Sequence, residues 1–109
     1  MAQALVTAFV AALAVAACAP MQASRLYASG TEALDRGEVT LAVGELERAA
    51  VLAPDASYVQ NHLGLAYAAA GREGDALTAF ERAVDLDCSN EAAQENLTAA
   101  RRRASHPTP

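Results

Sequence analysis

Few side chains of this 109-residue chain could take part in catalysis or hold a metal ion. The sequence contains two histidines, His62 and His106, two cysteines, Cys18 and Cys88, and no lysine. Schiff-base chemistry and phosphate binding by a P-loop lysine are therefore excluded. No acidic residue stands four residues from His62, where it could orient the imidazole ring on a helix, and the histidines and cysteines do not follow a metal-ligand spacing. We expect no catalytic residue, no metal site and no cofactor, so the chain is not predicted to be an enzyme.

The charge of the chain argues against a second class of function. The formal net charge is −5, whereas binding to nucleic acid needs a basic surface that contacts phosphates. The one basic run is Arg101-Arg102-Arg103. At the end of a helix these arginines would interact favourably with the helix dipole. The alternative is a contact with anionic headgroups or with an acidic partner.

The elements that could position a functional site begin after an uncharged segment of twenty residues. Its mainly apolar run from Ala4 to Ala19 would span about 24 Å as a helix, which is less than the roughly 30 Å of a bilayer core. A run of this length suits the apolar region of a secretory signal. It ends in Val15-Ala16-Ala17-Cys18, which resembles the lipobox of bacterial lipoproteins.

This resemblance implies a lipid anchor. Residues 1–17 would be a signal peptide removed before Cys18, which would carry a diacylglycerol on its sulfur and an acyl chain on its amino group, followed by a short linker within residues 18–22. Two or three acyl chains hold a protein stably on a membrane. By the same resemblance, Ala19 after the cysteine favours the outer membrane, with the body facing the periplasm. The alternatives are a plain secretory signal, cut near Ala17 or Ala19, and an uncleaved anchor.

The rest of the chain contains an internal repeat. Residues 23–56 and 57–90 align without gaps at an offset of 34 residues, and Glu47-Arg48-Ala49 recurs as Glu81-Arg82-Ala83. A period of this length indicates stacked helical units. The recurring small residues are Gly30 and Gly64, Gly37 and Gly71, Ala42 and Ala76, and Ala49 and Ala83.

The second copy resembles a tetratricopeptide repeat. The resemblance rests on Leu63-Gly64-Leu65-Ala66-Tyr67, followed by Gly71, Ala76, Phe80 and Ala83. It implies two tetratricopeptide repeats, 23–56 and 57–90, each made of two helices. Gly64 and Ala76 are expected to let the two helices approach closely, with Tyr67 and Phe80 beside the crossing. A capping helix over 91–104 would follow Asn90 as its N-cap, and 105–109 would be a disordered tail.

The predicted fold is therefore all-α, a short right-handed solenoid with a concave groove. We expect helices near residues 22–36, 39–53, 57–70, 73–87 and 91–103. Arrays of this kind usually need three or more repeats for stability. Since this chain has two repeats and a cap, a homodimer or a partner protein would supply the missing contacts.

The tetratricopeptide pattern also assigns residues to the groove. Small apolar, amide and aromatic side chains there would suit a peptide or a helix of a partner protein, and the alternatives are a solvated groove or one filled by a neighbouring subunit. The groove residues are Tyr27, Thr31, Leu34, Tyr58, Asn61, Leu65 and Arg102.

These features together predict an interaction protein of the cell envelope. By resemblance, small lipoproteins of this kind act as scaffolds or adaptors in pilus or secretion-channel assembly, or tether peptidoglycan-processing enzymes. The alternative function is a soluble periplasmic or cytoplasmic subunit of an obligate complex, in which the leader is a plain signal or anchor.

Overall fold

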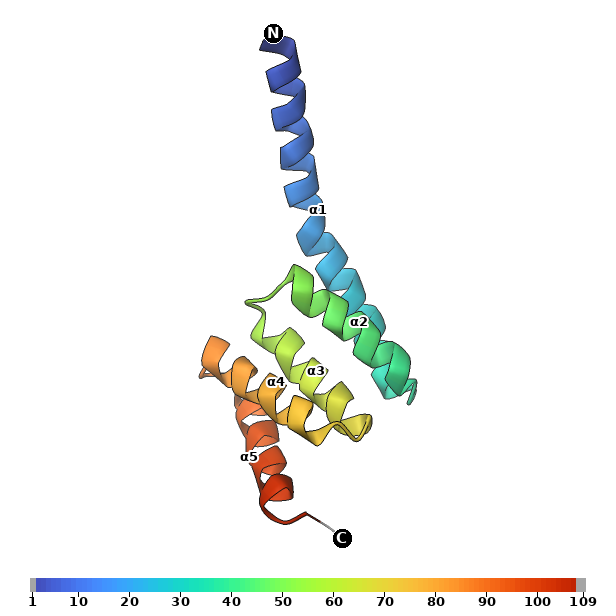
Figure 1. The fold of residues 1–109 in the computed structure, drawn as a ribbon, viewed down its shortest axis with the longest axis vertical. Coiled ribbons are helices and arrows are strands. Elements are labelled where there is room, and N and C mark those ends of the chain that lie inside the picture. Colours follow the sequence, from blue (N-terminus) through green and yellow to red (C-terminus); the bar gives the residue numbers. More distant parts are fainter. Residues whose placement is uncertain (1, 108–109) are drawn as a thin grey trace.

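The computed structural model describes the backbone of residues 2–107 and the side chains of residues 18–107, and it contains helices and no strand in that part of the chain. Each helix packs against its neighbour along the chain, and α3 also contacts α1 and α5. The all-α prediction is confirmed: the helices form a small helical solenoid (Figure 1). The helices are α1 (Ala2–Asp35), α2 (Val39–Leu52), α3 (Ser57–Ala69), α4 (Glu73–Leu86) and α5 (Glu91–Ser105).

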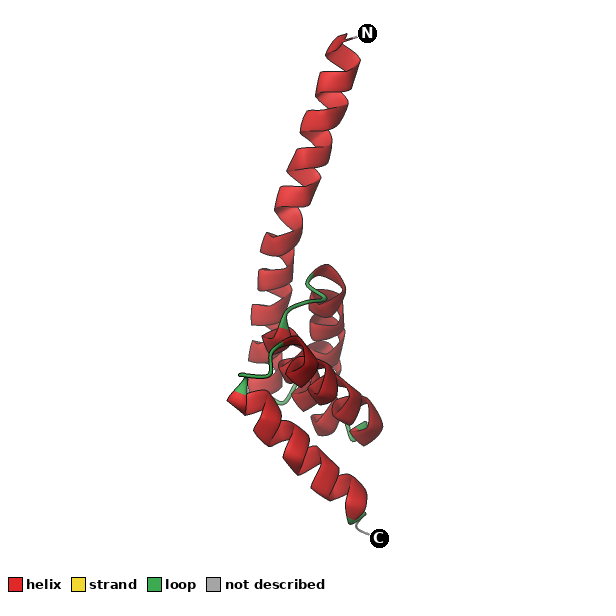
Figure 2. Cartoon of the chain, turned by 90° about the vertical axis from the view of Figure 1, so that its left-hand side faces the viewer, coloured by secondary structure: helices red, strands yellow, loops and turns green. Residues whose placement is uncertain are grey.

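Helix α1 begins much earlier than expected. A linker over 18–22 and a helix from about residue 22 were predicted, but the backbone is helical without a break from Ala2 through Pro20 to Asp35. Alanine and leucine, the main residues of this stretch, are strong helix formers, and they outweigh the single hydrogen bond that Pro20 removes. The first half of α1 extends beyond the other helices (Figures 1 and 2). The side chains of the predicted signal peptide, 1–17, lie outside the described residues.

The turns inside the two helix hairpins are copies of each other. Gly37 ends α1 with a φ of 76°, and Gly71 ends α3 with a φ of 75°. The N–H of Gly37 donates to the carbonyl of Leu34 over 3.0 Å, and the N–H of Gly71 donates to the carbonyl of Ala68 over the same distance. Only glycine adopts this left-handed conformation without steric cost. The recurrence of glycine at an offset of 34 residues therefore sets where both hairpins turn.

Two further glycines allow the helices of each hairpin to cross closely. A Cβ atom added to Gly64 would lie 2.4 Å from the ring of Phe80, and one added to Gly30 would lie 2.7 Å from Leu46. Phe80 and Leu46 are almost completely buried. The close approach predicted at Gly64 is confirmed, and the same pairing of glycine with a large side chain occurs in both repeats. Ala76 is also fully buried in the second hairpin.

The links between successive hairpins repeat in the same way. The N–H of Ala56 donates to the carbonyl of Ala53 over 3.2 Å before α3, and the N–H of Asn90 donates to the carbonyl of Asp87 over 3.1 Å before α5. The predicted N-cap of α5 is confirmed, because the side-chain oxygen of Asn90 accepts the N–H of Ala93 over 3.1 Å. Helix α5 thus follows α4 as α3 follows α2.

The side chains of Asn90 and Ser57 fasten this junction. The amide nitrogen of Asn90 donates to Ser57 Oγ over 2.9 Å, and Ser57 Oγ donates to the carbonyl of Ala83 over 2.7 Å. The start of α3, the end of α4 and the N-cap of α5 are therefore held by one chain of hydrogen bonds. Cys88, which stands beside it where the first repeat has Pro54, is exposed.

Corresponding positions on the odd-numbered helices show where the solenoid ends. Leu63 of α3 and Leu97 of α5 are buried against the preceding hairpin. The corresponding residue of α1 is Ser29, which is exposed, as is Glu32 one turn later. Polar side chains there are well solvated and need no preceding helix to cover them.

Candidate partner-binding site

Three aromatic side chains from α1 and α3 form a cluster on the face predicted to bind a partner. The ring of Tyr27 meets the ring of Tyr58 edge-on, with centroids 4.9 Å apart, and meets the ring of His62 in the same manner at 5.1 Å. Tyr58 and His62 lie one turn apart on α3, which places them on the same side of the helix. Tyr58 is 48% exposed. The aromatic cluster therefore presents a preformed, partly open apolar surface.

Hydrogen bonds hold the aromatic cluster in place. Nδ1 of His62 lies 3.0 Å from the carbonyl oxygen of Tyr58; because a carbonyl only accepts, Nδ1 donates this bond. The hydroxyl oxygen of Tyr27 lies 3.3 Å from the same nitrogen, so it can only accept a share of the same N–H. Burial, and then the neighbouring Tyr58, raise the pKa of the Tyr27 phenol above its ordinary value. Its hydroxyl stays neutral at physiological pH, which suits recognition and gives no activated nucleophile.

The other predicted groove residues have more varied surroundings. Asn61 is buried, and its side-chain oxygen accepts a hydrogen bond of 2.9 Å from Asn96 of α5. Leu34 packs against the core between the hairpins and Leu65 against the core under α5. Thr31 donates to a backbone carbonyl of its own helix.

The structure thus brings Tyr27 and Tyr58 together and places Arg102 apart from them, exposed near the end of α5. His62 was not assigned to the groove by the sequence. The signal that could have placed it there is its spacing of four residues from Tyr58, which puts both side chains on the same face of a helix.

A second surface, which the sequence did not indicate, is a groove between α2 and α4 over α3. We call it the α2–α4 groove; its volume is about 470 Å³. Gln60 forms part of its floor, and only 3% of its surface is exposed. The residues around it are Glu47, Ala50, Val51, Pro54, Asp55, Gln60, Leu63, Tyr67, Arg82 and Leu86.

Tyr67 packs against the core that contains Ala76 and Phe80, as predicted, and it also lines the α2–α4 groove. Its hydroxyl donates to Glu47 of α2 over 3.0 Å, and the guanidinium of Arg72 lies 4.5 Å from its ring centroid. Burial, followed by the hydrogen bond to Glu47, raises the pKa of the Tyr67 phenol. Tyr67 therefore ties the second hairpin to the first, and the Phe80 ring is the group nearest to Gly64 across the crossing.

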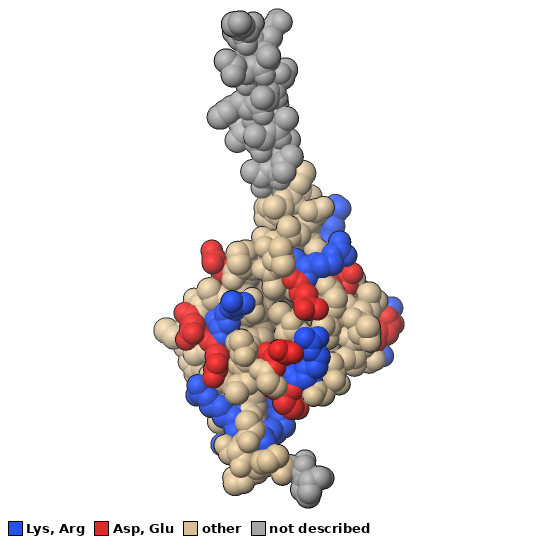
Figure 3. Space-filling model, in the orientation of Figure 1, with Lys and Arg blue, Asp and Glu red and all other residues tan. Residues whose placement is uncertain are grey.

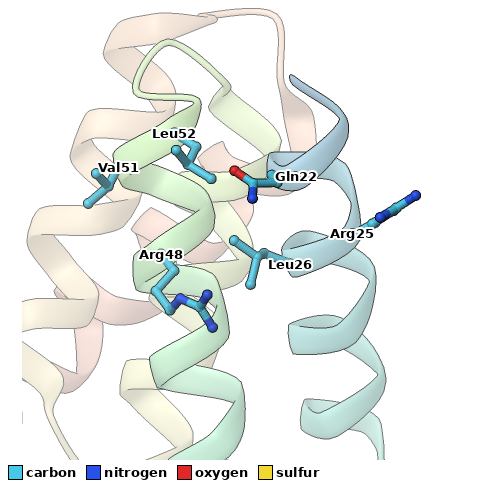
Figure 4. Close-up of a pocket in the computed structure, with 6 residues that line it drawn as sticks. All are labelled: Gln22, Arg25, Leu26, Arg48, Val51 and Leu52. Atoms are coloured by element: carbon cyan, nitrogen blue, oxygen red, sulfur yellow. The ribbon is translucent and has the colours of Figure 1, made fainter. Parts of the chain in front are cut away.

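A third depression lies between α1 and the end of α2, on the side nearest Cys18 (Figure 4). We call it the anchor-end depression, after the anchor that the sequence predicts at Cys18; its volume is about 540 Å³. Leu26 and Arg48 point into it from opposite helices, whereas Arg25 points outward from its rim. None of the seven predicted groove residues lines this depression or the α2–α4 groove. It is lined by Gln22, Arg25, Leu26, Arg48, Val51 and Leu52.

Acidic and basic side chains are interspersed over the face of the molecule seen in Figure 3. Two members of the arginine run take part in this pattern. Arg101 lies 3.8 Å from Glu81, and Arg103 lies 3.2 Å from Glu73, both on α4. The run was predicted to interact with the helix dipole or with an anionic surface, and the structure adds a contact that connects α5 to α4. Exposed pairs of this kind stabilise weakly.

Both cysteines, Cys18 and Cys88, are exposed free thiols. No group of three or more potential metal ligands comes together among the described residues. Over that same part of the chain, no helix is both long and apolar enough to cross a membrane. Comparison with models of known protein families and with curated protein sequences finds no match to this chain.

Proposed function

We propose that this chain is a lipid-anchored adaptor of the tetratricopeptide type, which binds a peptide or a helix of a partner protein in the bacterial envelope. The recurrence of turns, crossings and inter-hairpin hydrogen bonds at an offset of 34 residues supports the repeat assignment. The observation that carries the binding function is the aromatic cluster of Tyr27, Tyr58 and His62. Aromatic side chains that are already ordered lose little entropy when a partner covers them.

The surroundings of Cys18 support the anchor. Cys18 is exposed and therefore accessible to a modifying enzyme. A chain cut before Cys18 would also place Pro20 in the first turn of α1, where the missing N–H has no helical partner to lose. Cleavage would thus convert an unfavourable interior proline into a favourable one. An anchored adaptor would hold its partner close to the membrane surface.

Metabolic labelling tests the anchor. Cells that express the full chain are fed a fatty acid bearing an alkyne, and the purified protein is examined for the label. We expect labelling of the parent and of Cys88→Ser, and none of Cys18→Ser. Equal labelling of Cys18→Ser and the parent would reject Cys18 as the anchored residue. A parent that carries no label would favour the soluble subunit of an obligate complex.

Site-specific photocrosslinking tests the binding face. A photoreactive phenylalanine replaces Tyr58 in one variant and Leu41 in another; the two side chains are each 48% exposed, but Leu41 lies on α2, away from the cluster. We expect the variant at Tyr58 to form a discrete crosslinked species in cells and the variant at Leu41 to form much less of it. Equal crosslinking at both positions would show that the aromatic cluster is not the binding face.

A further inference from the structure

The end of the molecule nearest Cys18 differs from the rest of the surface in composition. Val51, at the end of α2, is 79% exposed, Met21 is 59% exposed and Leu52 is 36% exposed. Val51 and Leu52 line the anchor-end depression, and Met21 precedes the lining residue Gln22 in the chain. The lining also includes Arg25 and Arg48 and no carboxylate. Exposed apolar and basic side chains in one place are the combination that peripheral proteins present to membrane interfaces.

The internal repeat shows one difference between the ends of α2 and α4, at the position of Val51, while the residue that follows it is an exposed leucine in both repeats, Leu52 and Leu86. The position that corresponds to Val51 in the second repeat is Asp85, which is also exposed. Arg48 corresponds to Arg82, so the basic residue is common to both repeats. The apolar residue occurs only in the hairpin that follows Cys18, and the carboxylate occurs only in the hairpin farther along the chain. The two ends of α2 and α4 therefore offer different surfaces.

Distance from the anchor indicates what covers the surface. Gln22 follows Cys18 by four residues and Leu26 follows it by eight, which corresponds to about 6 and about 12 Å along a helix. Helix α2 runs back toward the same end (Figure 1). There Leu52 lies on the side of α2 that faces α1, and Val51 points outward from the other side (Figure 4). The headgroup layer of one leaflet is roughly 5–7 Å thick. A chain held at Cys18 thus places Gln22 within the headgroup layer and Leu26 about 5 Å beyond it if α1 stands upright. Tilting α1 toward the membrane would bring the whole anchor-end depression onto the headgroups.

We propose that the anchor-end depression docks onto an anionic lipid surface, with Arg25 and Arg48 contacting headgroup phosphates and Val51 entering the interface. This inference rests on the proposed anchoring at Cys18. Arg48 also lies 3.3 Å from Glu45, but its side chain is 68% exposed, so its guanidinium has further donors free for a phosphate. Docking would fix the orientation of the body, and of the aromatic cluster, relative to the membrane.

Tryptophan fluorescence tests the docking, because the chain contains no tryptophan. Val51→Trp places a single reporter in the proposed interface, and Asp85→Trp places one at the corresponding exposed position of the second repeat. Each full chain is reconstituted into vesicles of brominated phosphatidylcholine with or without phosphatidylglycerol. We expect blue-shifted, quenched emission from Val51→Trp on the anionic vesicles only, and unquenched emission from Asp85→Trp on both.

Charge removal then tests the role of the arginines. In the Val51→Trp chain, the double substitution Arg25→Gln and Arg48→Gln should lower the ratio of docked to undocked protein about 25-fold. This figure is the product of two effects, because each basic residue near an anionic surface changes the ratio roughly five-fold. Arg82→Gln, the matched control, should leave the ratio unchanged. Docking is overturned if Val51→Trp is quenched no more than Asp85→Trp, and the anionic preference is overturned if both lipid compositions quench it equally.

The same preparations separate this inference from the proposed anchor. Their intact mass reports whether Cys18 carries acyl chains. Quenching of a chain without acyl chains would support the docking surface and reject the anchor. Acylation without quenching would support the anchor and reject the docking surface.

Discussion

Replacing Gly64 by alanine should destabilise the protein, although the same change stabilises most helices. A Cβ at this position would meet three carbons of the Phe80 ring, at 2.4, 2.6 and 2.9 Å. The ring is 1% exposed and has no free space to move into. Overpacking of this kind costs about 1–3 kcal/mol, and with three contacts below 3.0 Å we take the upper value. The better helix propensity of alanine returns about 1 kcal/mol, which leaves a net loss of about 2 kcal/mol.

This loss can be measured by thermal unfolding followed by circular dichroism. For a domain of this size, a loss of about 2 kcal/mol lowers Tm by roughly 8–16 °C. Gly44→Ala is the matched control, because Gly44 lies inside α2 and a Cβ there would meet no atom within 4 Å. Its gain of about 1 kcal/mol should raise Tm by roughly 4–8 °C. The two glycine substitutions are therefore expected to act in opposite directions.

A double-mutant cycle identifies the ring as the cause. In a Phe80→Leu background the side chain opposite Gly64 is smaller, so Gly64→Ala should cost less than it does in the parent. Two results would refute the reasoning: a Gly64→Ala protein at least as stable as the parent, or an unchanged cost in the Phe80→Leu background. Either would mean that the helices of the second hairpin do not cross at this glycine.

Three further substitutions test the turns and the junctions between hairpins. Asn90→Ala should lower the free energy of unfolding by about 1–2 kcal/mol, because it removes the N-cap of α5 and the hydrogen bond to Ser57. Urea denaturation measures this loss, and an unchanged midpoint would show that Asn90 does not stabilise the junction before α5. Gly71→Ala should cost about 1–2 kcal/mol because of its positive φ, whereas Gly74→Ala, at a position with free space, should not destabilise; parallel urea curves compare them. The raised pKa of Tyr67 means that the folded state holds the phenol proton more tightly than the unfolded chain does. The stabilisation of the folded state that results is fully present below the unfolded pKa of about 10, and it is lost as the pH rises through the folded pKa. Tyr67→Phe should therefore weaken the decline of the urea midpoint at high pH, and an identical decline would contradict this interpretation.

The sequence predicted the helices of the body closely because glycine marks their ends. Gly37 and Gly71 adopt a backbone conformation that other residues avoid, and Asn90 is a strong N-cap. The start of α1 was not predictable in the same way, because Pro20 is usually read as the end of a helix. In this chain the flanking alanines continue the helix on both sides of it.

The binding surfaces were less predictable, since they depend on which side chains meet between hairpins. The repeat pattern assigned Asn61 to the groove, but its burial comes from Asn96, which lies 35 residues away. Tyr67 was assigned to the helix crossing and packs there, but the sequence did not predict that its hydroxyl reaches Glu47 of the preceding hairpin. A pattern of residue types predicts which face of its helix a residue occupies. It does not predict the hydrogen-bond partner of a polar side chain, because that depends on how neighbouring hairpins stack.

The recurrence of the junction before α3 and the junction before α5 makes residues 57–90 an interchangeable module. Leu63 and Leu97 occupy corresponding sites in the two junctions. A duplicate of 57–90 inserted after Asn90 would therefore pack on the original as α5 does now, and α5 would pack on the duplicate in the same way. In stacked arrays each added unit contributes its own stability and one more interface. The copy number of this module would then act as a spacer, setting how far the C-terminal helix stands from Cys18, the residue proposed to carry the anchor.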